Sequence, residues 1–177
     1  MSAYKITETE THIFFLTGPL SQWHPALFYA NFKTGDDKHL FNCAEQYMMA
    51  AKAKQFEDED TFDKIMKAPR PREQKQFGRA VKNFVTEAWN AQAEDIVFRG
   101  NYFRAIQNKE YRDVLISSDN KYLVEGNKDD GIWGVALHWD DPAILDSNNW
   151  NGRNLLGKVH MKVRTKVNEQ MDFGWQV

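Results

Sequence analysis

The chain has little cysteine, few prolines and no long hydrophobic run. Its 177 residues include one cysteine and five prolines. A single cysteine forms no internal disulfide and cannot supply the paired thiolates of a zinc finger or ribbon. The longest apolar runs, 13–16 and 47–51, are far shorter than the roughly 20 residues that span a bilayer. Disulfide scaffolds, cysteine-based zinc modules and membrane-spanning proteins are therefore excluded, and no membrane partner is expected.

An excess of charge of one sign is also missing. The chain has 23 Lys and Arg against 25 Asp and Glu, for a net charge of −2. This balance argues against a broad electrostatic surface for nucleic acid but leaves a local one open. Residues 1–10 contain no basic segment followed by an apolar core, so no secretory signal is expected. The length fits one domain of roughly 100–200 residues, and we expect a soluble, cytoplasmic protein.

Turn signals and apolar spacing predict an α+β fold in which helix dominates. A hairpin is expected around Gly35-Asp36-Asp37, and Asn42 with Glu45 three residues later predicts a helix start with a capping box. The expected strands are 12–16, 27–32, 40–41, 122–125 and 132–137. The expected helices are about 42–55, 60–67, 71–83, 87–108, 109–116 and 155–167.

Aromatic residues are abundant, whereas standard catalytic motifs are missing. The 12 Phe, 6 Trp and 6 Tyr exceed what one modest core needs, so some rings are expected to face a ligand. We find no dinucleotide fingerprint, phosphate-binding loop, serine elbow or His-Glu-x-x-His pair. The five histidines share no metal-ligand spacing, and neither a metal nor a cofactor is expected. Cys43 stands at a helix start, where packing is a better expectation than nucleophilic chemistry.

The first informative feature is the helix NCAEQYMMAAKAKQF. Glu45 and Lys52 are seven residues apart, which places them on one helix face about 10 Å apart along the axis. A carboxylate and an amine arranged in this way could act as acid/base and nucleophile. The alternative is that Glu45 only caps the helix and Lys52 is solvated, and spacing alone favours this alternative.

Two further features lie in the C-terminal third. In LVEGNKDDGIWG, Asp130 precedes Trp133 by three residues, which suits either a ring-stacking pocket with a polar anchor or a surface turn with a core tryptophan. In NWNGRNLLGKVHMKVR, a loop leads into a helix that Asn154 can cap. Free N–H groups at that helix start, with Arg153 beside them, could bind phosphate or carboxylate. An ordinary capped loop is the better interpretation of this segment taken alone.

Taken together and in order, these segments resemble the NADAR family, which includes the YbiA-like N-glycosidases. Each motif is weak, but the ordered set covers the chain from about residue 14 to 167. The matching pieces are Leu20-Ser21-Gln22-Trp23, NCAEQYMMAAKAKQF, Ala68-Pro69 followed by Gly78-Arg79, Trp89, LVEGNKDDGIWG and GRNLLGKVHMKVR.

The resemblance implies one compact α+β domain over 1–177, with a core of about 12–168 and a short C-terminal tail. It implies hydrolysis of the bond between ribose C1 and a nitrogen in a phosphoribosyl substrate, of the riboflavin-intermediate type, or in an ADP-ribosyl substrate such as ADP-ribosyl-guanine. The partner would be a small nucleotide-like molecule, with ADP-ribosylated nucleic acid as an open alternative. The oligomeric state is not predicted.

Residue roles follow from the same resemblance. Glu45 matches the essential glutamate, Lys52 matches a lysine proposed to attack ribose C1, and Asp130 is the third catalytic candidate. The substrate-binding candidates are Ser21, Gln22, Arg79, Trp89, Trp133, Gly134 and Asn154. The chain departs from the family pattern at Gln22, Gln46, Arg104-Ala105 and Ala136, and Gln22, Gln46 and Ala136 are expected to line or shape the pocket.

Two mechanisms and two other function classes stay open. Lys52 could form an imine with an opened ribose, or Glu45 could activate water while Lys52 only neutralises its charge. A non-catalytic module that binds NAD or ADP-ribose would use Trp133, Arg79 and Asn154, but it would not need Glu45 together with Lys52. An interaction protein would leave the polar loops 126–131 and 148–154 without a purpose.

Overall fold

The computed structural model describes residues 4–172 and divides the chain into two compact units. The terminal unit comprises residues 1–24 and 109–177, and the central unit comprises residues 25–108. Small sheets and predominant helices confirm the predicted α+β class. The final five residues of the predicted C-terminal tail lie outside the described residues. No helix within 4–172 is both long and apolar enough to cross a membrane.

A three-stranded sheet forms the base of the terminal unit. Its order is β1 (Ile6–Glu8), β2 (His12–Phe15) and β5 (Tyr122–Glu125), with β1 antiparallel and β5 parallel to β2. The middle of β2 and β5 is buried, as their short, nearly continuous apolar sequences require. The predicted strand at 122–125 is confirmed, whereas β1 was not predicted.

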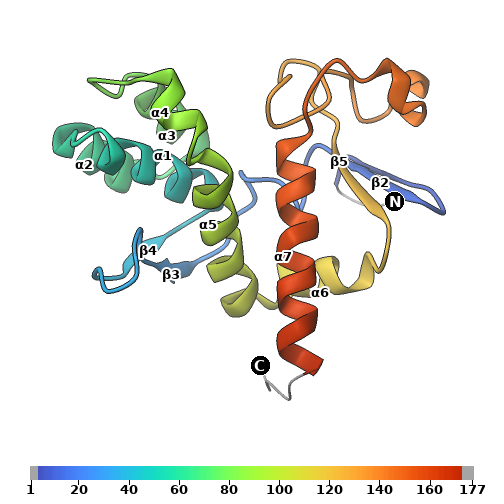
Figure 1. Cartoon of the computed structure of the whole chain (residues 1–177), viewed down its shortest axis with the longest axis horizontal. Coiled ribbons are helices and arrows are strands. Elements are labelled where there is room, and N and C mark those ends of the chain that lie inside the picture. The colour runs from blue at the N-terminus through green and yellow to red at the C-terminus, as the bar shows by residue number, and fades with distance from the viewer. Residues whose placement is uncertain (1–3, 173–177) are drawn as a thin grey trace. The chain divides into compact units, whose positions relative to one another are not determined.

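The terminal unit is completed by α6 (Lys109–Ser117) and α7 (Leu155–Asp172), which contact each other, and α7 also packs on β5 (Figure 1). Four residues of α7 at helical spacing are fully buried: Leu156, Val159, Val163 and Val167. The apolar stripe therefore confirms the predicted helix, which continues five residues beyond the predicted end at 167. Two short 3-10 helices, Pro142–Leu145 and Ser147–Asn149, precede it.

Replacing Gly157 with alanine is expected to destabilise the protein. A Cβ at this position would lie 2.0 Å from the Leu123 carbonyl oxygen, so α7 would have to move away from β5. Overpacking of this kind costs about 1–3 kcal/mol, which urea unfolding followed by circular dichroism will measure. Gly131→Ala is the control, because its Cβ would meet only ordinary contacts at 3.9 Å or more. Equal stability of the two variants would contradict the packing argument.

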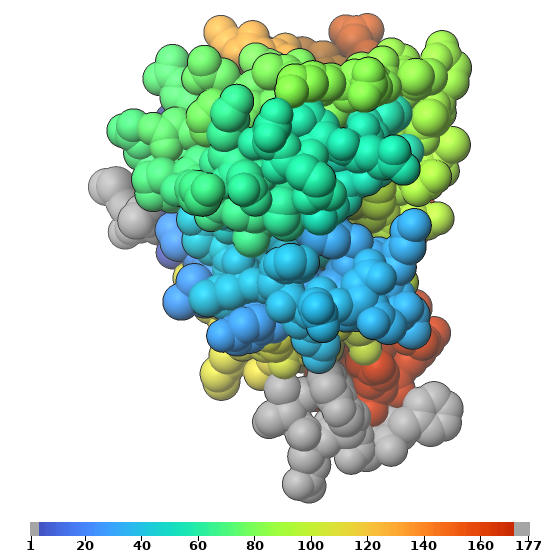
Figure 2. All heavy atoms as spheres, turned by 90° about the vertical axis from the view of Figure 1, so that its left-hand side faces the viewer, coloured from blue at the N-terminus to red at the C-terminus, as the bar shows by residue number. Residues whose placement is uncertain are grey.

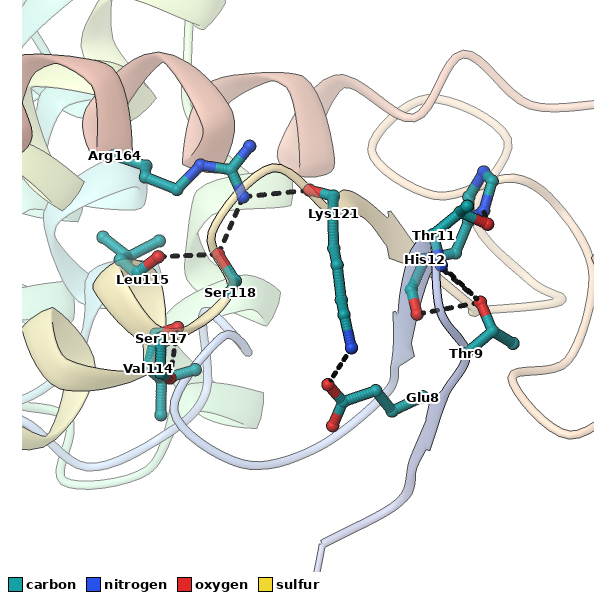
Figure 3. A network of polar contacts seen from close by, with 10 residues as sticks. All are labelled: Glu8, Thr9, Thr11, His12, Val114, Leu115, Ser117, Ser118, Lys121 and Arg164. Carbon is teal, nitrogen blue, oxygen red and sulfur yellow. Dashed lines mark hydrogen bonds and ion pairs between the residues drawn. The ribbon is translucent and has the colours of Figure 1, made fainter.

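A buried arginine fixes the turn that leads from α6 into β5. Arg164 donates from Nη1 to Ser118 Oγ at 2.7 Å and to the Lys121 carbonyl at 2.9 Å (Figure 3). Burial lowers the pKa of Arg164, and the negative charge of Asp119 opposes this shift. The Lys121 ammonium also pairs with Glu8 of β1. These contacts tie α7 to the sheet through the turn at 118–121.

The central unit begins with the predicted hairpin, β3 (Phe28–Ala30) paired antiparallel with β4 (His39–Phe41). Gly35, with φ +95°, supplies a left-handed residue in the connection. The Gln107 carboxamide accepts from the Tyr29 N–H and donates to its carbonyl, both at 2.8 Å, so it satisfies the outer edge of β3. Figure 2 shows the blue hairpin beside the turquoise helix α2 (Glu59–Lys67), which it contacts through His39 and Phe62.

Helix α1 (Ala44–Gln55) is the centre of this unit. It contacts α2, α3 (Pro71–Arg79) and α5 (Ala93–Gln107), and most of its residues are buried. A helix packed on several sides is buried around its circumference, which explains its lack of a polar face.

The structure corrects several predicted boundaries. The helix expected at 71–83 ends at Arg79, and the expected stretch 87–108 divides into α4 (Thr86–Asn90) and α5. The strand predicted at 132–137 is wrong. Its backbone forms no strand ladder: the Val135 N–H donates to the Glu125 carbonyl at the end of β5, and the Val135 carbonyl accepts from the N–H groups of Asn151 and Gly152 in a loop. Ala136, with φ 57°, further breaks the extended conformation.

Candidate active site

Glu45 lies in the first turn of α1 but does not cap it. The N-cap is Cys43, whose side chain makes no capping hydrogen bond, so the predicted capping box from Asn42 to Glu45 is wrong. Instead, Gln46 Oε1 accepts the Asn42 N–H at 2.8 Å, and Gln46 Nε2 donates to the Ile65 and Met66 carbonyls of α2. Gln46 therefore has a structural role in joining α1 to α2. Glu45 is buried, with 5% of its surface exposed, and is not needed as a cap.

Lys52 lies two turns further along α1, on the same face as Glu45. Its ammonium nitrogen is 4.0 Å from the centre of the Phe84 ring and 5.7 Å from that of the Trp89 ring. Burial, followed by the positive charge of Arg79 at the end of α3, lowers the pKa of Lys52. A solvated surface lysine would have neither feature. Lys52 therefore differs from the solvated residue that the alternative interpretation expects.

Cys43 is a packing residue, as predicted. It is buried, and its Sγ donates to Gln74 Oε1 at 3.1 Å. Burial raises the pKa of the thiol to about 11. Because the thiolate is the reactive form, Cys43 does not act as a nucleophile near neutral pH.

In the terminal unit, Asp130 organises the loop that carries Trp133. Its Oδ1 accepts the N–H groups of Ile132 at 2.9 Å and Trp133 at 2.8 Å. No hydrogen bond reaches Asp130 Oδ2 from residues 4–172, which leaves that oxygen available to a ligand. Trp133 is half-buried, whereas Gly134 is buried against the Glu125 and Asp130 carbonyls, which a Cβ would approach to 2.8 and 3.0 Å.

The start of α7 is closed by the same loop. The N–H groups of residues 153–156 donate to the carbonyls of Gly131, Gly134, Ile132 and Trp133, in that order, at 3.0–3.2 Å. The free N–H groups that an anion site would need are therefore already paired. This pairing argues against the predicted phosphate or carboxylate site at this helix start, and the Asn154 side chain, which bonds to β5, does not cap the helix.

Asn154 serves the fold rather than an exposed surface. It is buried, adopts a left-handed conformation with φ 52°, and bonds twice to the edge of β5 that does not pair with β2. Its Oδ1 accepts the Glu125 N–H at 3.0 Å, and its Nδ2 donates to the Leu123 carbonyl at 2.9 Å. The two polar atoms of the side chain therefore pair with the backbone of β5 as the N–H and C=O groups of a neighbouring strand would.

Replacing Asn154 with alanine is expected to lower the free energy of unfolding by about 2–4 kcal/mol, because a buried donor and a buried acceptor lose their partners. Urea unfolding measures this loss. Asn151→Ala is the matched control, since Asn151 is exposed and its side chain bonds only to the neighbouring Asn149 carbonyl. A stable Asn154→Ala variant with weakened ligand binding would instead favour the predicted binding role.

Ser21 and Gln22, the remaining candidates, lie in the loop that follows β2. Ser21 Oγ accepts the Trp23 N–H at 3.2 Å, and Gln22 is buried. The Leu20 carbonyl before them is held by His160 of α7, a satisfied core histidine that lies 2.7 Å from both this oxygen and the Tyr111 hydroxyl. Within residues 4–172, no cluster of His, Cys, Asp or Glu has the arrangement of a metal site.

Phe84 is the residue that sequence reasoning missed. The central unit gathers Lys52, Arg79, Phe84 and Trp89, whereas the terminal unit gathers Asp130, Trp133, Gly134 and Asn154. Phe84 belongs to the loop before α4 and carries no motif. Its one signal in the sequence is a large aromatic side chain directly after the polar pair Lys82-Asn83, and 40% of its surface is exposed in the structure.

The family model described as the NADAR domain matches residues 13–168. The chain belongs to the NADAR family. N-glycosidase R617 of Acanthamoeba polyphaga mimivirus is 40% identical over 144 residues, which cover 81% of this chain and 84% of that protein. Protein irg-1 of Caenorhabditis elegans is 30% identical and covers 95% of this chain and 86% of its own length. These similarities confirm the predicted family.

More distant NADAR relatives confirm the fold. N-glycosidase YbiA of Shigella flexneri is 24% identical over 131 residues, covering 74% of this chain and 73% of that protein. The NMR structure of Escherichia coli YbiA matches with a TM-score of 0.70 at 20% identity, covering 94% of this chain and 90% of that one. At this identity the structural match establishes the helix-dominant α+β fold alone.

Proposed function

We propose that this chain is an N-glycosidase that hydrolyses the bond between ribose C1 and a nitrogen in a phosphoribosyl or ADP-ribosyl substrate. Two relatives named N-glycosidase support the enzyme class, a hydrolase that acts on N-glycosyl compounds. The observation that carries the proposal is Lys52, a half-buried amine with a lowered pKa on the same helix face as the buried Glu45. A module that only bound its ligand would need neither group in this arrangement.

Lys52 acts as the nucleophile in this proposal. As a free amine it attacks ribose C1, the C1–N bond breaks, and the leaving nitrogen takes a proton. The Glu45 carboxylate stabilises the positive charge that develops at C1, accepts the proton that the attacking amine loses and passes it to the leaving nitrogen. The bond between C1 and the ring oxygen then breaks as the Lys52 nitrogen forms an imine with C1, and the ring oxygen takes the second proton that this nitrogen loses. Addition of water to the imine carbon releases the sugar and restores the amine.

Other side chains bind the substrate. Arg79, exposed at the end of α3, supplies a positive charge for phosphate. Asp130 Oδ2 accepts a ribose hydroxyl, while Oδ1 holds the loop. Trp89 and Trp133 provide ring surfaces for stacking, and Ser21, Gln22 and Gly134 contribute to shape and polarity. In this proposal Asn154 acts indirectly, because it fixes the strand and the loop that carries Asp130.

The test is a substrate panel assayed for released base: a ribosylamine phosphate, NAD and DNA carrying ADP-ribosyl-guanosine, with ADP-ribose-1″-phosphate, whose terminal ribose has a C1–O bond, as the negative control. Release from at least one of the first three supports the proposal and identifies the substrate class. Thermal unfolding with ADP-ribose is measured in parallel. A clear rise in melting temperature without base release from any member would overturn the enzyme and favour the binding module.

A further inference from the structure

The segment between α3 and α4 places an aromatic ring over the Lys52 amine. Phe84 lies 4.0 Å from Lys52 Nζ, closer than the Trp89 ring at 5.7 Å. The Phe56 ring meets that of Phe84 edge-on, with centroids 5.3 Å apart, and so helps to set its orientation. Phe84 is 40% exposed, so the burial of its apolar side chain does not by itself explain why the ring lies over the amine.

A buried carboxylate holds this segment on its other side. Asp58, the N-cap of α2, accepts the Thr61 N–H through Oδ1 at 3.1 Å and the Lys82 N–H through Oδ2 at 2.8 Å. Asn83 follows with φ 56°, and Phe84 comes next. The Lys82 side chain also pairs with Asp60 at 3.2 Å. The backbone two residues before Phe84 is therefore fixed to the start of α2.

We propose that Phe84 is a positioning residue for the Lys52 amine, and that Asp58 fixes the segment from which Phe84 acts. The ring displaces water from one side of Nζ and limits the rotamers of a long, flexible side chain. This inference rests on the proposed function only in giving Lys52 a chemical role. The placement of the amine is a separate claim, and it is testable without substrate.

Burial is the first cause of the lowered pKa of Lys52, and the charged group identified beside it is Arg79 of α3. Removing the ring admits water, which raises the pKa of Lys52 toward the ordinary lysine value of about 10.4, whereas loss of the cation–π contact lowers it. We expect the admission of water to prevail, because burial is the first cause of the shift. A leucine at position 84 keeps an apolar cover but lacks the face of an aromatic ring. Comparison of alanine with leucine therefore separates exclusion of water from the cation–π contact.

The experiment compares the full chain with Phe84→Ala, Phe84→Leu and Val85→Ala. Val85 is the matched control, since it is an exposed apolar residue in the same segment. Competitive labelling with a neutral acylating reagent across pH, read by peptide mass spectrometry, gives the titration midpoint of Lys52. Values of kcat and KM are measured on the substrate that the panel identifies. We expect Phe84→Ala to raise the midpoint and to lower kcat about 10- to 100-fold with little change in KM.

The titration midpoint and kcat together test two claims: the positioning role of Phe84 and the nucleophilic role of Lys52. A raised midpoint with reduced kcat supports both, and a smaller change in Phe84→Leu supports exclusion of water as the main effect. A raised midpoint with unchanged kcat supports the positioning role but overturns Lys52 as the nucleophile. A midpoint equal to that of Val85→Ala and the unmodified chain, in both Phe84 variants, overturns the positioning role.

Asp58→Asn tests the second part of the inference. The amide matches the carboxylate in size but turns a donor NH₂ group toward either Thr61 or Lys82, so one of the two backbone hydrogen bonds is lost. We expect the Lys52 midpoint to rise in the same direction as in Phe84→Ala, by a smaller amount. An unchanged midpoint in Asp58→Asn beside a raised one in Phe84→Ala would overturn the role of Asp58.

Discussion

Replacing Glu45 with glutamine is expected to lower kcat by about 10²- to 10⁴-fold, the usual effect of removing a general acid/base. Glutamine keeps the shape of a side chain that is only 5% exposed, so packing of α1 is preserved. It cannot take a proton from the attacking amine or carry the negative charge that stabilises positive charge at ribose C1. Steady-state assays of base release measure the loss.

Glu59→Gln is the matched control for this prediction. Glu59 also lies in the first turn of a helix, α2, but it is exposed and pairs with Lys54. Both variants should keep the circular dichroism spectrum of the unmodified chain, and Glu59→Gln should keep its activity. A Glu45→Gln enzyme with near-normal kcat would remove Glu45 from the mechanism.

Replacing Lys52 with methionine or arginine is expected to reduce kcat by about 10³-fold or more, as the loss of a nucleophile does. Methionine keeps much of the apolar stem, and arginine keeps the positive charge, but neither presents a free amine. Borohydride added during turnover should attach the sugar to Lys52 in the unmodified chain and to neither variant. Mass spectrometry of the α1 peptide detects this adduct.

The pH dependence of imine formation follows from the lowered pKa of Lys52. Below that pKa the amine is protonated and cannot attack. The trapping rate should therefore rise as the pH passes through it, at a lower pH than an ordinary lysine would require. If Lys52→Arg keeps more than about a tenth of kcat, the water mechanism with Lys52 as a neutralising charge replaces the imine.

Local signals account for the parts of the fold that were predicted correctly. The strand at 122–125 and the hairpin turn at Gly35 depend on residues close together in sequence, as does the apolar stripe of α7. Residues 132–137 resemble a strand because they are apolar, but their conformation is set by hydrogen bonds to the start of α7, about 20 residues away. Spacing within one segment contains no information about such partners.

In the candidate site, too, some features follow from local sequence and others depend on residues far along the chain. The shared face of Glu45 and Lys52 follows from helix geometry and was predicted, because α1 is continuous between them. The surroundings of Lys52 could not be predicted from the helix alone, since they include the rings of Phe84 and Trp89, 32 and 37 residues further along the chain. Likewise, Asn154 was predicted to bind substrate because it belongs to a family motif. Its side chain instead bonds to Leu123 and Glu125 of β5, which a long loop separates from it in the sequence.

The parallel pairing of β2 with β5 has a consequence for the order of folding. His12 lies opposite Tyr122, so the sheet joins segments separated by more than half the chain. During synthesis, β2 leaves the ribosome long before its partner exists, while all of the central unit, residues 25–108, is made in between. Closing so long a loop is slow. We expect the exposed apolar edge of β2 to make the nascent chain prone to aggregation until β5 has emerged.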